Sequence, residues 1–329
     1  MRPFSYTRPD SVDAAVHAYL ESSPDVRYIG GGTNLIDLMK MGVERPAHLI
    51  DINRLPLTGI EEHEGGLRIG ALVRNADCAN DEKVRTRYPI LSQAMLAGAS
   101  GQLRNMATMG GNLLQSTRCY YFYDPSYREC NMRVPGSGCA AKLGVNRIHA
   151  ILGASEACIA TNPSDMSVAL AVLNAKINVR GPKGDRTIPI LEFHRLPGTT
   201  PHITTNLHPG ELITSIDLPP MDFGTRSCYL KVRDRRSYAF ALVSVAAILN
   251  MDTGGAIREA RLALGGVALK PWRAQHSEQA LAGKNASPEI FRHAAALAVE
   301  GAKPYKDNAF KVELARRAVV RALTTVSQG

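Results

Sequence analysis

Short apolar runs separated by polar turns fill most of the chain, and their spacing predicts a mixture of helices and strands. The first helix is expected at residues 12–20, where apolar side chains repeat on one face and Asp10 or Ser11 is the N-cap. The predicted helices are 12–20, 35–41, a short one near Asn75 and Cys78, 88–98, 166–173, 289–301 and 307–325. The predicted strands are 26–29, 48–52, 67–73, 176–180, 186–190, 212–218, 227–232, 240–249 and 258–264. Pro219 and Pro220 mark the expected boundary between a domain of residues 1–220 and one of residues 221–329.

Residues 117–146 interrupt this pattern with about thirty positions that have neither helical nor strand periodicity. Loops longer than about 12–15 residues are uncommon and are usually functional or disordered. Four consecutive aromatic residues, at positions 120–123, argue against disorder. Something other than regular secondary structure therefore has to order this segment.

Two glycine-rich segments are candidate ligand sites. Gly30, Gly31 and Gly32 lie between a predicted strand and a predicted helix, an arrangement in which backbone N–H groups converge on an anion. A plain tight turn is the alternative, and the spacing fits neither a P-loop nor a G-x-G-x-x-G motif. The second segment, residues 108–112, exposes backbone where a bulky ligand can approach.

Both segments suit a flavin dinucleotide, whose pyrophosphate needs several N–H donors at close range. Residues 30–34 would supply them, and residues 108–112 would hold the ribityl chain or the other side of the phosphates. Asp165 can accept hydrogen bonds from ribityl hydroxyls, although an N-cap role before Met166 is equally compatible. Lys231 is a candidate for the flavin ring, where a cation would stabilise an anionic reduced form, and a surface lysine is the alternative reading.

Four of the six cysteines fall within forty residues, with the spacing C-x10-C-x8-C-x18-C. Zinc sites use tighter pairs, and ferredoxin spacing is absent, so neither kind of site is favoured. Four thiolates could still surround a [4Fe–4S] cluster if the loop wraps around it, and four structural or free thiols are as compatible with the pattern. The four cysteines are Cys119, Cys130, Cys139 and Cys158. Cys78 and Cys228 are expected to be ordinary packed thiols.

The composition is that of a soluble globular protein, with 45% hydrophobic and 21% charged residues. The net charge of +9 is spread without interleaved aromatics, so no nucleic-acid partner is expected. No apolar run is long enough to span a membrane. The beginning of the sequence has no apolar export segment, so no signal peptide is expected.

Three motifs carry a resemblance to a known family: YIGGGTNL at 28–35, QLRNMATMGGNL at 102–113 and PSD at 163–165. They resemble the FAD-binding medium subunit of the molybdenum hydroxylases, the family of xanthine dehydrogenase and carbon monoxide dehydrogenase. The resemblance extends over nearly the whole chain. The cysteine loop, with RCYYFYD at 118–124 and PGSGCAA at 135–141, is most similar to the flavoprotein subunit of periplasmic aldehyde oxidoreductase.

The resemblance implies an α+β fold: a two-subdomain, PCMH-like FAD-binding domain, then a small α+β C-terminal domain of the carbon monoxide dehydrogenase flavoprotein type. It implies FAD and, on the cysteine loop at about 117–158, a [4Fe–4S] cluster ligated by the four cysteines. The partners would be a small [2Fe–2S] subunit and a large molybdenum-cofactor subunit. Electrons would pass from the partners' clusters to FAD and on to an external electron acceptor, with no catalytic residue for the aldehyde in this chain. Co-export to the periplasm with a partner is favoured, and the cytoplasm is the alternative.

The residues expected to bind the cofactor combine the three motifs with two further positions. They are Tyr28, Ile29, Gly30, Gly31, Gly32, Thr33, Asn34, Leu35, Thr108, Gly110, Gly111, Asn112, Ser164, Asp165, Ile213 and Lys231. Three alternatives remain open: a flavoprotein subunit of another molybdenum hydroxylase (xanthine, CO or aromatic acyl-CoA type), a free-standing FAD reductase of the same fold, and a non-enzymatic iron–sulfur or zinc scaffold.

Overall fold

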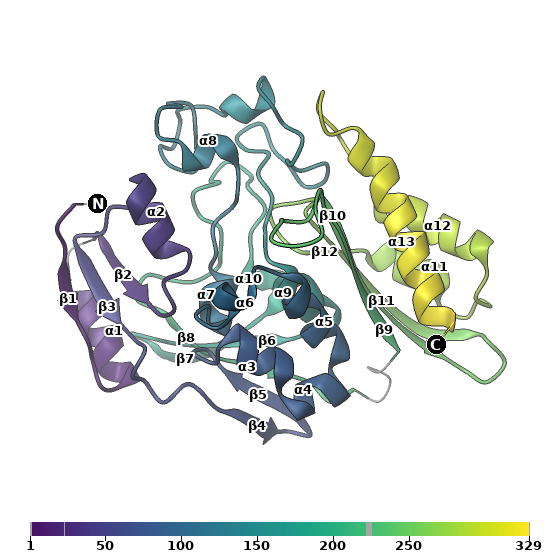
Figure 1. Cartoon of the computed structure of the whole chain (residues 1–329), viewed down its shortest axis with the longest axis horizontal. Helices are drawn as coiled ribbons and strands as arrows, with labels where there is room; N and C mark the ends of the chain where they lie inside the picture. Colours follow the sequence, from purple (N-terminus) through teal and green to yellow (C-terminus); the bar gives the residue numbers. More distant parts are fainter. Residues whose placement is uncertain (1, 23, 222–225, 329) are drawn as a thin grey trace.

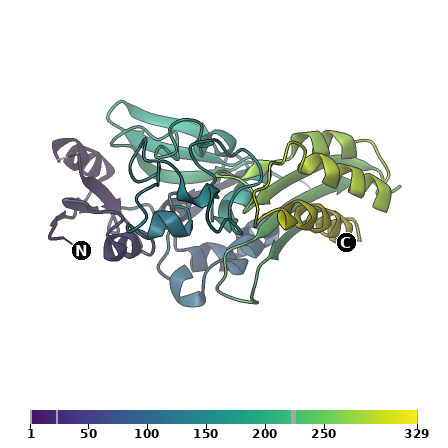
Figure 2. The same ribbon diagram turned by 90° about the horizontal axis from the view of Figure 1, so that it is seen from above.

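A computed structural model describes residues 2–22, 24–221 and 226–328, and Figure 1 shows three sheets with their helices. The first sheet is parallel, in the order β1-β3-β2. Its elements are β1 (Ser5–Thr7), α1 (Val12–Glu21), β2 (Val26–Ile29), α2 (Leu35–Met41) and β3 (His48–Asp51). α1 begins at an N-cap in which the Ser11 hydroxyl accepts from the backbone N–H of Ala14. This small unit lies at one end of the molecule in Figure 2.

The second sheet is antiparallel, in the order β4-β5-β8-β6-β7. Its strands are β4 (Ile60–His63), β5 (Gly66–Gly70), β6 (Lys176–Gly181), β7 (Gly184–Pro189) and β8 (Leu212–Leu218). The accompanying helices are α3 (Asn75–Asn80), α4 (Glu82–Arg87), α5 (Pro89–Ala97), α6 (Gly101–Arg104), α7 (Met109–Leu113), α9 (Asp165–Val172) and α10 (Ile190–Phe193). All eight residues of α9 except Asp165 are buried, since this helix lies in the centre of the molecule.

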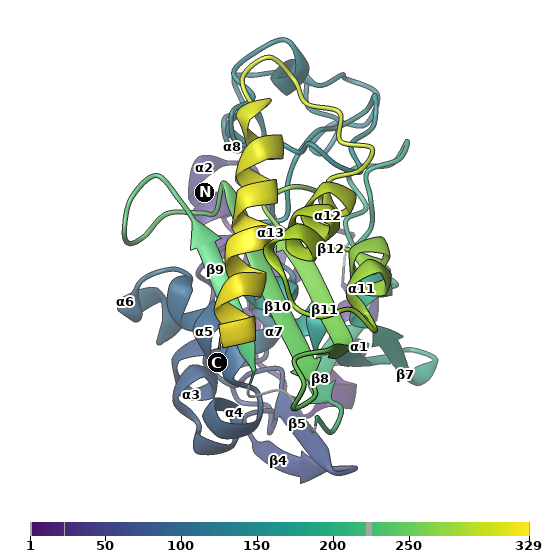
Figure 3. The ribbon, with the colours of Figure 1, turned by 90° about the vertical axis from the view of Figure 1, so that its right-hand side faces the viewer.

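The third sheet is antiparallel, in the order β12-β11-β10-β9, and three helices cover its outer face (Figure 3). Its elements are β9 (Ser227–Val232), β10 (Val243–Met251), β11 (Ile257–Gly265), β12 (Trp272–Arg273), α11 (Gln275–Leu281), α12 (Pro288–Ala298) and α13 (Phe310–Gln328). On β10, Val245 and Ala247 join the apolar core beneath these helices, while Ala246 and Ile248 join the core around α9. The strand is apolar at successive positions because both of its faces are buried.

The cysteine loop projects from the molecule above the sheets, beside the segment that precedes α13 (Figure 1). It contains two short helical turns, α8 (Tyr120–Tyr123) and the 3-10 helix η1 (Ala140–Lys142). It has its own apolar cluster, to which α2 contributes Leu38 and the chain after β11 contributes Leu269. The loop has no long helix or strand, so short turns and a small apolar core hold its shape.

The expected α+β class is confirmed, and most predicted elements lie within a few residues of their expected positions. Two predicted strands need correction. The strand expected over 67–73 ends at Gly70. The strand expected from Phe240 begins at Val243, and Phe240 itself is exposed. Several short elements were not expected, because their few residues carry no clear apolar period: β1, β4, β12, α4, α6, α7, α8, α10, α11 and η1.

The domain boundary expected after Pro220 lies next to residues 222–225, which are outside the described residues. Within the ranges that the structure does describe, no helix is both long enough and apolar enough to cross a membrane.

Candidate functional site

The two glycine-rich segments lie against each other. A Cβ added at Gly31 would lie 1.9 Å from the carbonyl oxygen of Met106, and one at Gly30 would lie 3.3 Å from Oγ1 of Thr108. Gly32 has a φ of +72°, a conformation that favours glycine. The segment 30–32 therefore requires glycine for its backbone shape and for its close approach to residues 106–108.

Residues 30–34 are half-buried, and their backbone N–H groups donate to no acceptor within the described chain. Buried or half-buried N–H groups are normally paired with some acceptor. A row of such donors between a strand and a helix matches the need of a pyrophosphate. The predicted phosphate-binding loop thus fits the group that it would hold.

The second segment forms the short helix α7, whose N-cap Thr108 accepts a hydrogen bond from the Gly111 N–H at 3.2 Å. Gly110 packs on β8, where its Cβ position is 3.7 Å from Cβ of Ile213. Gly111 is exposed. Oδ1 of Asn112 accepts a hydrogen bond of 2.7 Å from the Ser164 hydroxyl. These contacts bring six predicted residues from three separate segments of the sequence to one place.

Asp165 and Lys231 form a buried ion pair, with 2.7 Å between Oδ2 and Nζ. The Tyr229 hydroxyl donates to Oδ1 of the same carboxylate at 2.6 Å. Burial, followed by the neighbouring Asp165 carboxylate, raises the pKa of Tyr229 well above its usual range. Ser164, and not Asp165, is the N-cap of α9, because its hydroxyl accepts from the Ser167 N–H.

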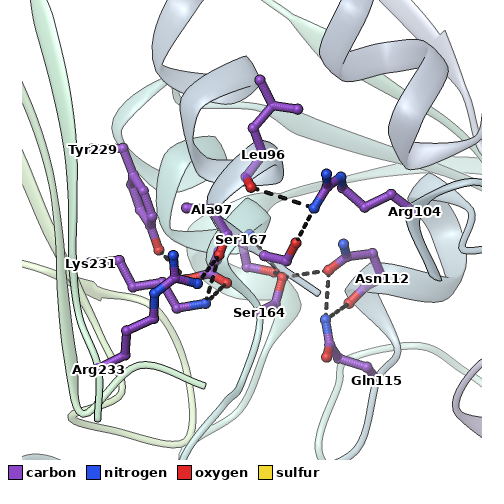
Figure 4. Close-up of polar contacts among 12 residues, drawn as sticks. Leu96, Ala97, Arg104, Asn112, Gln115, Ser164, Ser167, Tyr229, Lys231 and Arg233 are labelled. Atoms are coloured by element: carbon purple, nitrogen blue, oxygen red, sulfur yellow. Dashed lines mark hydrogen bonds and ion pairs between the residues drawn. The ribbon is translucent and has the colours of Figure 1, made fainter. Parts of the chain in front are cut away.

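Three cations surround the carboxyl end of α5 near this ion pair (Figure 4). Arg233 and Lys231 donate to the carbonyl oxygen of Ala97 at 2.9 and 3.1 Å, and Arg104 donates to that of Gly98 at 2.7 Å. Cations at the carboxyl end of a helix are stabilised by its partial negative charge. The ion pair neutralises only one of them, so the neighbourhood is positive and suits an anionic cofactor.

The structure shows the surroundings of the other predicted side chains. Lys231 is not a surface lysine, since its side chain is 3% exposed. The hydroxyl of Tyr28 donates to the Gly210 carbonyl oxygen at 3.0 Å, and its ring stacks on Tyr19, so this side chain packs within the fold. The side chain of Asn34 forms hydrogen bonds with the Tyr123 hydroxyl of the cysteine loop and with the Ser116 N–H just before it. Ile29, Thr33 and Leu35 are half-buried along the same segment.

All four cysteines of the loop line one small cavity, together with Phe122 and other apolar side chains. Cys119 precedes α8, Cys130 and Cys139 face each other across an isolated antiparallel bridge, and Cys158 reaches the cavity from the end of the loop. The fold therefore gathers the predicted set of ligands. Cys78 and Cys228 belong to other apolar clusters, and burial raises the pKa of both thiols.

Hydrogen bonds link the sulfurs to their surroundings. The Cys158 thiol bonds to the sulfur of Cys139, which lowers the pKa of Cys139 to about 6 and raises that of Cys158. Burial raises the pKa of Cys119 to about 12. The imidazole of His149 lies beside Cys119, with 3.1 Å between Nε2 and Sγ, and burial lowers the pKa of His149 to about 4.

Among the described residues, no three His, Cys, Asp or Glu side chains are close enough to share one metal ion. The arrangement therefore does not match a mononuclear zinc site, in which four ligands lie about 2.0–2.3 Å from one ion. In a [4Fe–4S] cluster each thiolate binds a different iron, so the sulfurs stand further apart around a larger group. Four cysteines line one cavity, as that donor set requires, but Cys139 and Cys158 are hydrogen-bonded to each other, so their sulfurs would have to move apart around such a group.

A hydrogen-bonded link joins the phosphate-binding loop to the cysteine loop. Nδ2 of Asn34 donates to the Tyr123 hydroxyl at 2.9 Å, and Oδ1 of Asn34 accepts from the Ser116 N–H at 2.8 Å. Arg118, next to Cys119, donates to the same Tyr123 hydroxyl and lies over the ring of Phe240. The two candidate sites therefore share side chains.

The sequence does not predict four further residues that lie at these sites. Tyr229, Arg233, Tyr123 and His149 act by contacts between segments far apart in sequence. A tyrosine two residues before Lys231 on the same strand face was the one available signal, because alternate residues of a strand share a face.

These features define a flavin-binding domain followed by an α+β domain, and comparison with known families agrees. Residues 2–221 match the FAD binding domain in molybdopterin dehydrogenase, and residues 228–326 match the CO dehydrogenase flavoprotein C-terminal domain. The chain belongs to this family of FAD-binding subunits of molybdenum hydroxylases, which are oxidoreductases.

Relatives of known name cover nearly the whole chain. The chain is 51% identical to the aldehyde oxidoreductase FAD-binding subunit PaoB of Escherichia coli, over 98% of each sequence. It is 31% identical to the glyceraldehyde dehydrogenase medium chain of Sulfolobus acidocaldarius, over 98% of this chain and 95% of that one.

Solved structures of the family have the same fold. A chain of quinoline 2-oxidoreductase from Pseudomonas putida 86 superposes with a TM-score of 0.77 at 26% identity, covering 100% of this chain and 98% of that one. A chain of carbon monoxide dehydrogenase from Hydrogenophaga pseudoflava gives 0.77 at 27% identity, covering 99% and 98%.

Proposed function

We propose that this chain is the FAD-binding, electron-transferring medium subunit of a molybdenum-dependent aldehyde oxidoreductase. The observation that carries the proposal is the 51% identity to the E. coli aldehyde oxidoreductase subunit across 98% of both chains. The partners would be a small [2Fe–2S] subunit and a large molybdenum-cofactor subunit. In this assembly the aldehyde is oxidised on the large subunit, and this chain delivers the electrons to an external acceptor.

The chain's own residues would hold FAD between the two glycine-rich segments. The N–H groups of residues 30–34 would bind the pyrophosphate, and Gly111 and Asn112 would lie along the middle of the cofactor. The buried pair of Asp165 and Lys231 would face its ribityl chain and ring. When bound, FAD accepts electrons singly or in pairs and can therefore connect one-electron clusters to a two-electron acceptor.

We further propose that Cys119, Cys130, Cys139 and Cys158 ligate a [4Fe–4S] cluster. Their common cavity and the absence of long elements in residues 117–146 support this proposal. Binding such a group would close several chain segments at once and order the loop. The proposed compartment is the periplasm, reached together with an exported partner, with the cytoplasm as the alternative.

The test is to purify the chain alone and in complex with its partner subunits. We expect one FAD per chain in both, and about four iron and four sulfide atoms per chain in the isolated protein. Aldehyde should reduce the flavin only in the complex, because nothing in the described residues provides a site for aldehyde oxidation. Aldehyde turnover by the chain alone would contradict the proposal and would favour a free-standing reductase.

A further inference from the structure

His149 is buried beside the cysteine cavity without belonging to the proposed ligand set. Its residue is 1% exposed, and Nε2 lies 3.1 Å from Sγ of Cys119. The rings of Tyr120 and Tyr121 lie 6.5 and 6.3 Å from the imidazole. The imidazole is therefore shielded from water, and its closest polar neighbour is a cysteine sulfur.

The backbone of His149 is held from several sides. Its carbonyl oxygen accepts hydrogen bonds from Nζ of Lys311 at 2.8 Å and from Nδ2 of Asn308 at 3.2 Å. Its N–H donates to the carbonyl oxygen of Asn146 at 3.0 Å. Lys311 and Asn308 are themselves fully buried. The backbone that carries the imidazole is thus held near Cys119 by Asn146 and by two residues of the C-terminal domain.

The contacts of the ring decide which nitrogen carries the proton. In the described structure Nδ1 is buried and has no hydrogen-bond partner. A proton on Nδ1 would be an unsatisfied buried donor, and it would leave the lone pair of Nε2 facing the sulfur. A proton on Nε2 is donated to the sulfur instead. We assign the Nε2–H tautomer on these grounds.

We propose that His149 is a positioning residue for the iron–sulfur cluster, donating an Nε2–H···Sγ hydrogen bond to the Cys119 thiolate. This inference rests on the proposed cluster. A hydrogen bond to a ligating sulfur stabilises the reduced cluster more than the oxidised one, because reduction adds negative charge to the sulfurs. His149 therefore raises the reduction potential of the cluster without being one of its ligands.

The experiment compares two substitutions in the complex with its partner subunits. His149→Leu removes the donor and keeps an apolar side chain, whereas His149→Gln keeps an N–H donor at a similar reach. Iron and sulfide content is measured first, and the midpoint potential is then taken from a redox titration followed by electron paramagnetic resonance. His194→Leu is the matched control, since His194 is also buried and its Nε2 bonds to the Leu113 carbonyl oxygen, not to a cysteine.

We expect His149→Leu to keep its iron and to lower the ratio of reduced to oxidised cluster at a fixed potential by about threefold to tenfold. Tenfold corresponds to about 59 mV for a one-electron couple. His149→Gln should restore most of the shift, and His194→Leu should leave the potential unchanged. The donor role is also supported if His149→Leu loses the cluster while His149→Gln keeps it at the wild-type midpoint potential.

Two results would overturn the inference. One is a full cluster with an unchanged potential in His149→Leu. The other is loss of the cluster from both variants, which would make the imidazole a ligand or a packing element. A wild-type protein without iron and sulfide would instead refute the proposed cluster, so the two failures are distinguishable.

Discussion

The Asp165 carboxylate lies 2.7 Å from the Lys231 ammonium in the interior of the protein, although 66 positions separate the two residues. Asp165 begins α9 in the FAD-binding domain, and Lys231 lies on β9 of the following domain. Their side chains are only 9% and 3% exposed. The ion pair therefore ties the two domains together beside the proposed flavin site.

Replacing Lys231 by Met should lower the free energy of unfolding by about 3–5 kcal/mol, because the buried Asp165 charge loses its partner. Bound FAD should fall as well. Urea unfolding and the FAD content of the purified variant measure the two effects. Arg317→Met is the control, since it breaks an exposed ion pair with Glu313 and should change stability by less than about 1 kcal/mol. An equal effect of both substitutions would contradict the interpretation.

Substitution of Gly111 separates ligand space from chain packing. Gly111 is exposed, and an added Cβ would meet only the Oγ1 of Thr108 at 2.9 Å. Gly111→Val should therefore leave a folded protein while weakening FAD binding by at least about tenfold, because the side chain occupies space that the cofactor needs. Circular dichroism and bound FAD per chain provide the readouts.

Two further glycines serve as references for this measurement. Gly101→Ala should bind FAD normally, since nothing lies within 4 Å of its Cβ position. Gly31→Ala should disturb the loop itself, because the new Cβ would overlap the Met106 carbonyl oxygen. Full FAD occupancy in Gly111→Val would remove this loop from the binding site.

Cysteine substitutions test the proposed cluster ligands. A Cys→Ser change at position 119, 130, 139 or 158 should lower iron and sulfide by about four atoms per chain. The same change at Cys78 or Cys228 should leave iron unaltered, because these thiols pack in other apolar clusters. A full cluster in Cys158→Ser, together with loss of iron in Cys78→Ser, would show that the ligand set is wrong.

Lys311 predicts a pH dependence of stability. Its Nζ donates to the carbonyl oxygens of His149 at 2.8 Å and Gly266 at 2.5 Å, and burial lowers its pKa from 10.5 to about 7. Between pH 7 and 10.5 the unfolded chain binds the proton that the folded chain has lost. This group therefore makes stability rise with pH in that window, by at most about 1.4 kcal/mol per pH unit.

Urea unfolding at several pH values checks this expectation. The rise in unfolding free energy with pH that Lys311 contributes should disappear in Lys311→Met. It should persist in Lys306→Met, because Lys306 is exposed. A wild-type slope in Lys311→Met would show that Lys311 keeps its proton in the folded state.

The sequence predicted the elements and the segments that form the candidate sites better than it predicted the contacts inside those sites. The glycine loop after β2 and the four cysteines could be recognised because their residue types are unusual and local. The pairing of Asp165 with Lys231 depends on how two sheets and α9 pack, and no local pattern records it. The strand β1 was missed because its three residues are exposed and have no apolar period.

The two proposed cofactor sites should be coupled. Asn34 of the phosphate-binding loop forms hydrogen bonds with the Tyr123 hydroxyl and the Ser116 N–H. Ser116 precedes Cys119 in the sequence and Tyr123 follows it. Loss of the cluster should loosen the cysteine loop, and this should release Asn34 and weaken FAD binding.

A double-mutant cycle measures this coupling. FAD affinity is determined by fluorescence titration in the wild type, Cys130→Ser, Tyr123→Phe and the double variant. Each single change should weaken binding about fivefold, the effect of one lost hydrogen bond. The double variant should bind no more weakly than Cys130→Ser alone, because both changes break the same link. If the two fold-changes in FAD affinity multiply in the double variant, the two loops act independently. The contact between Asn34 and Tyr123 would then have no role in coupling the cluster to FAD binding.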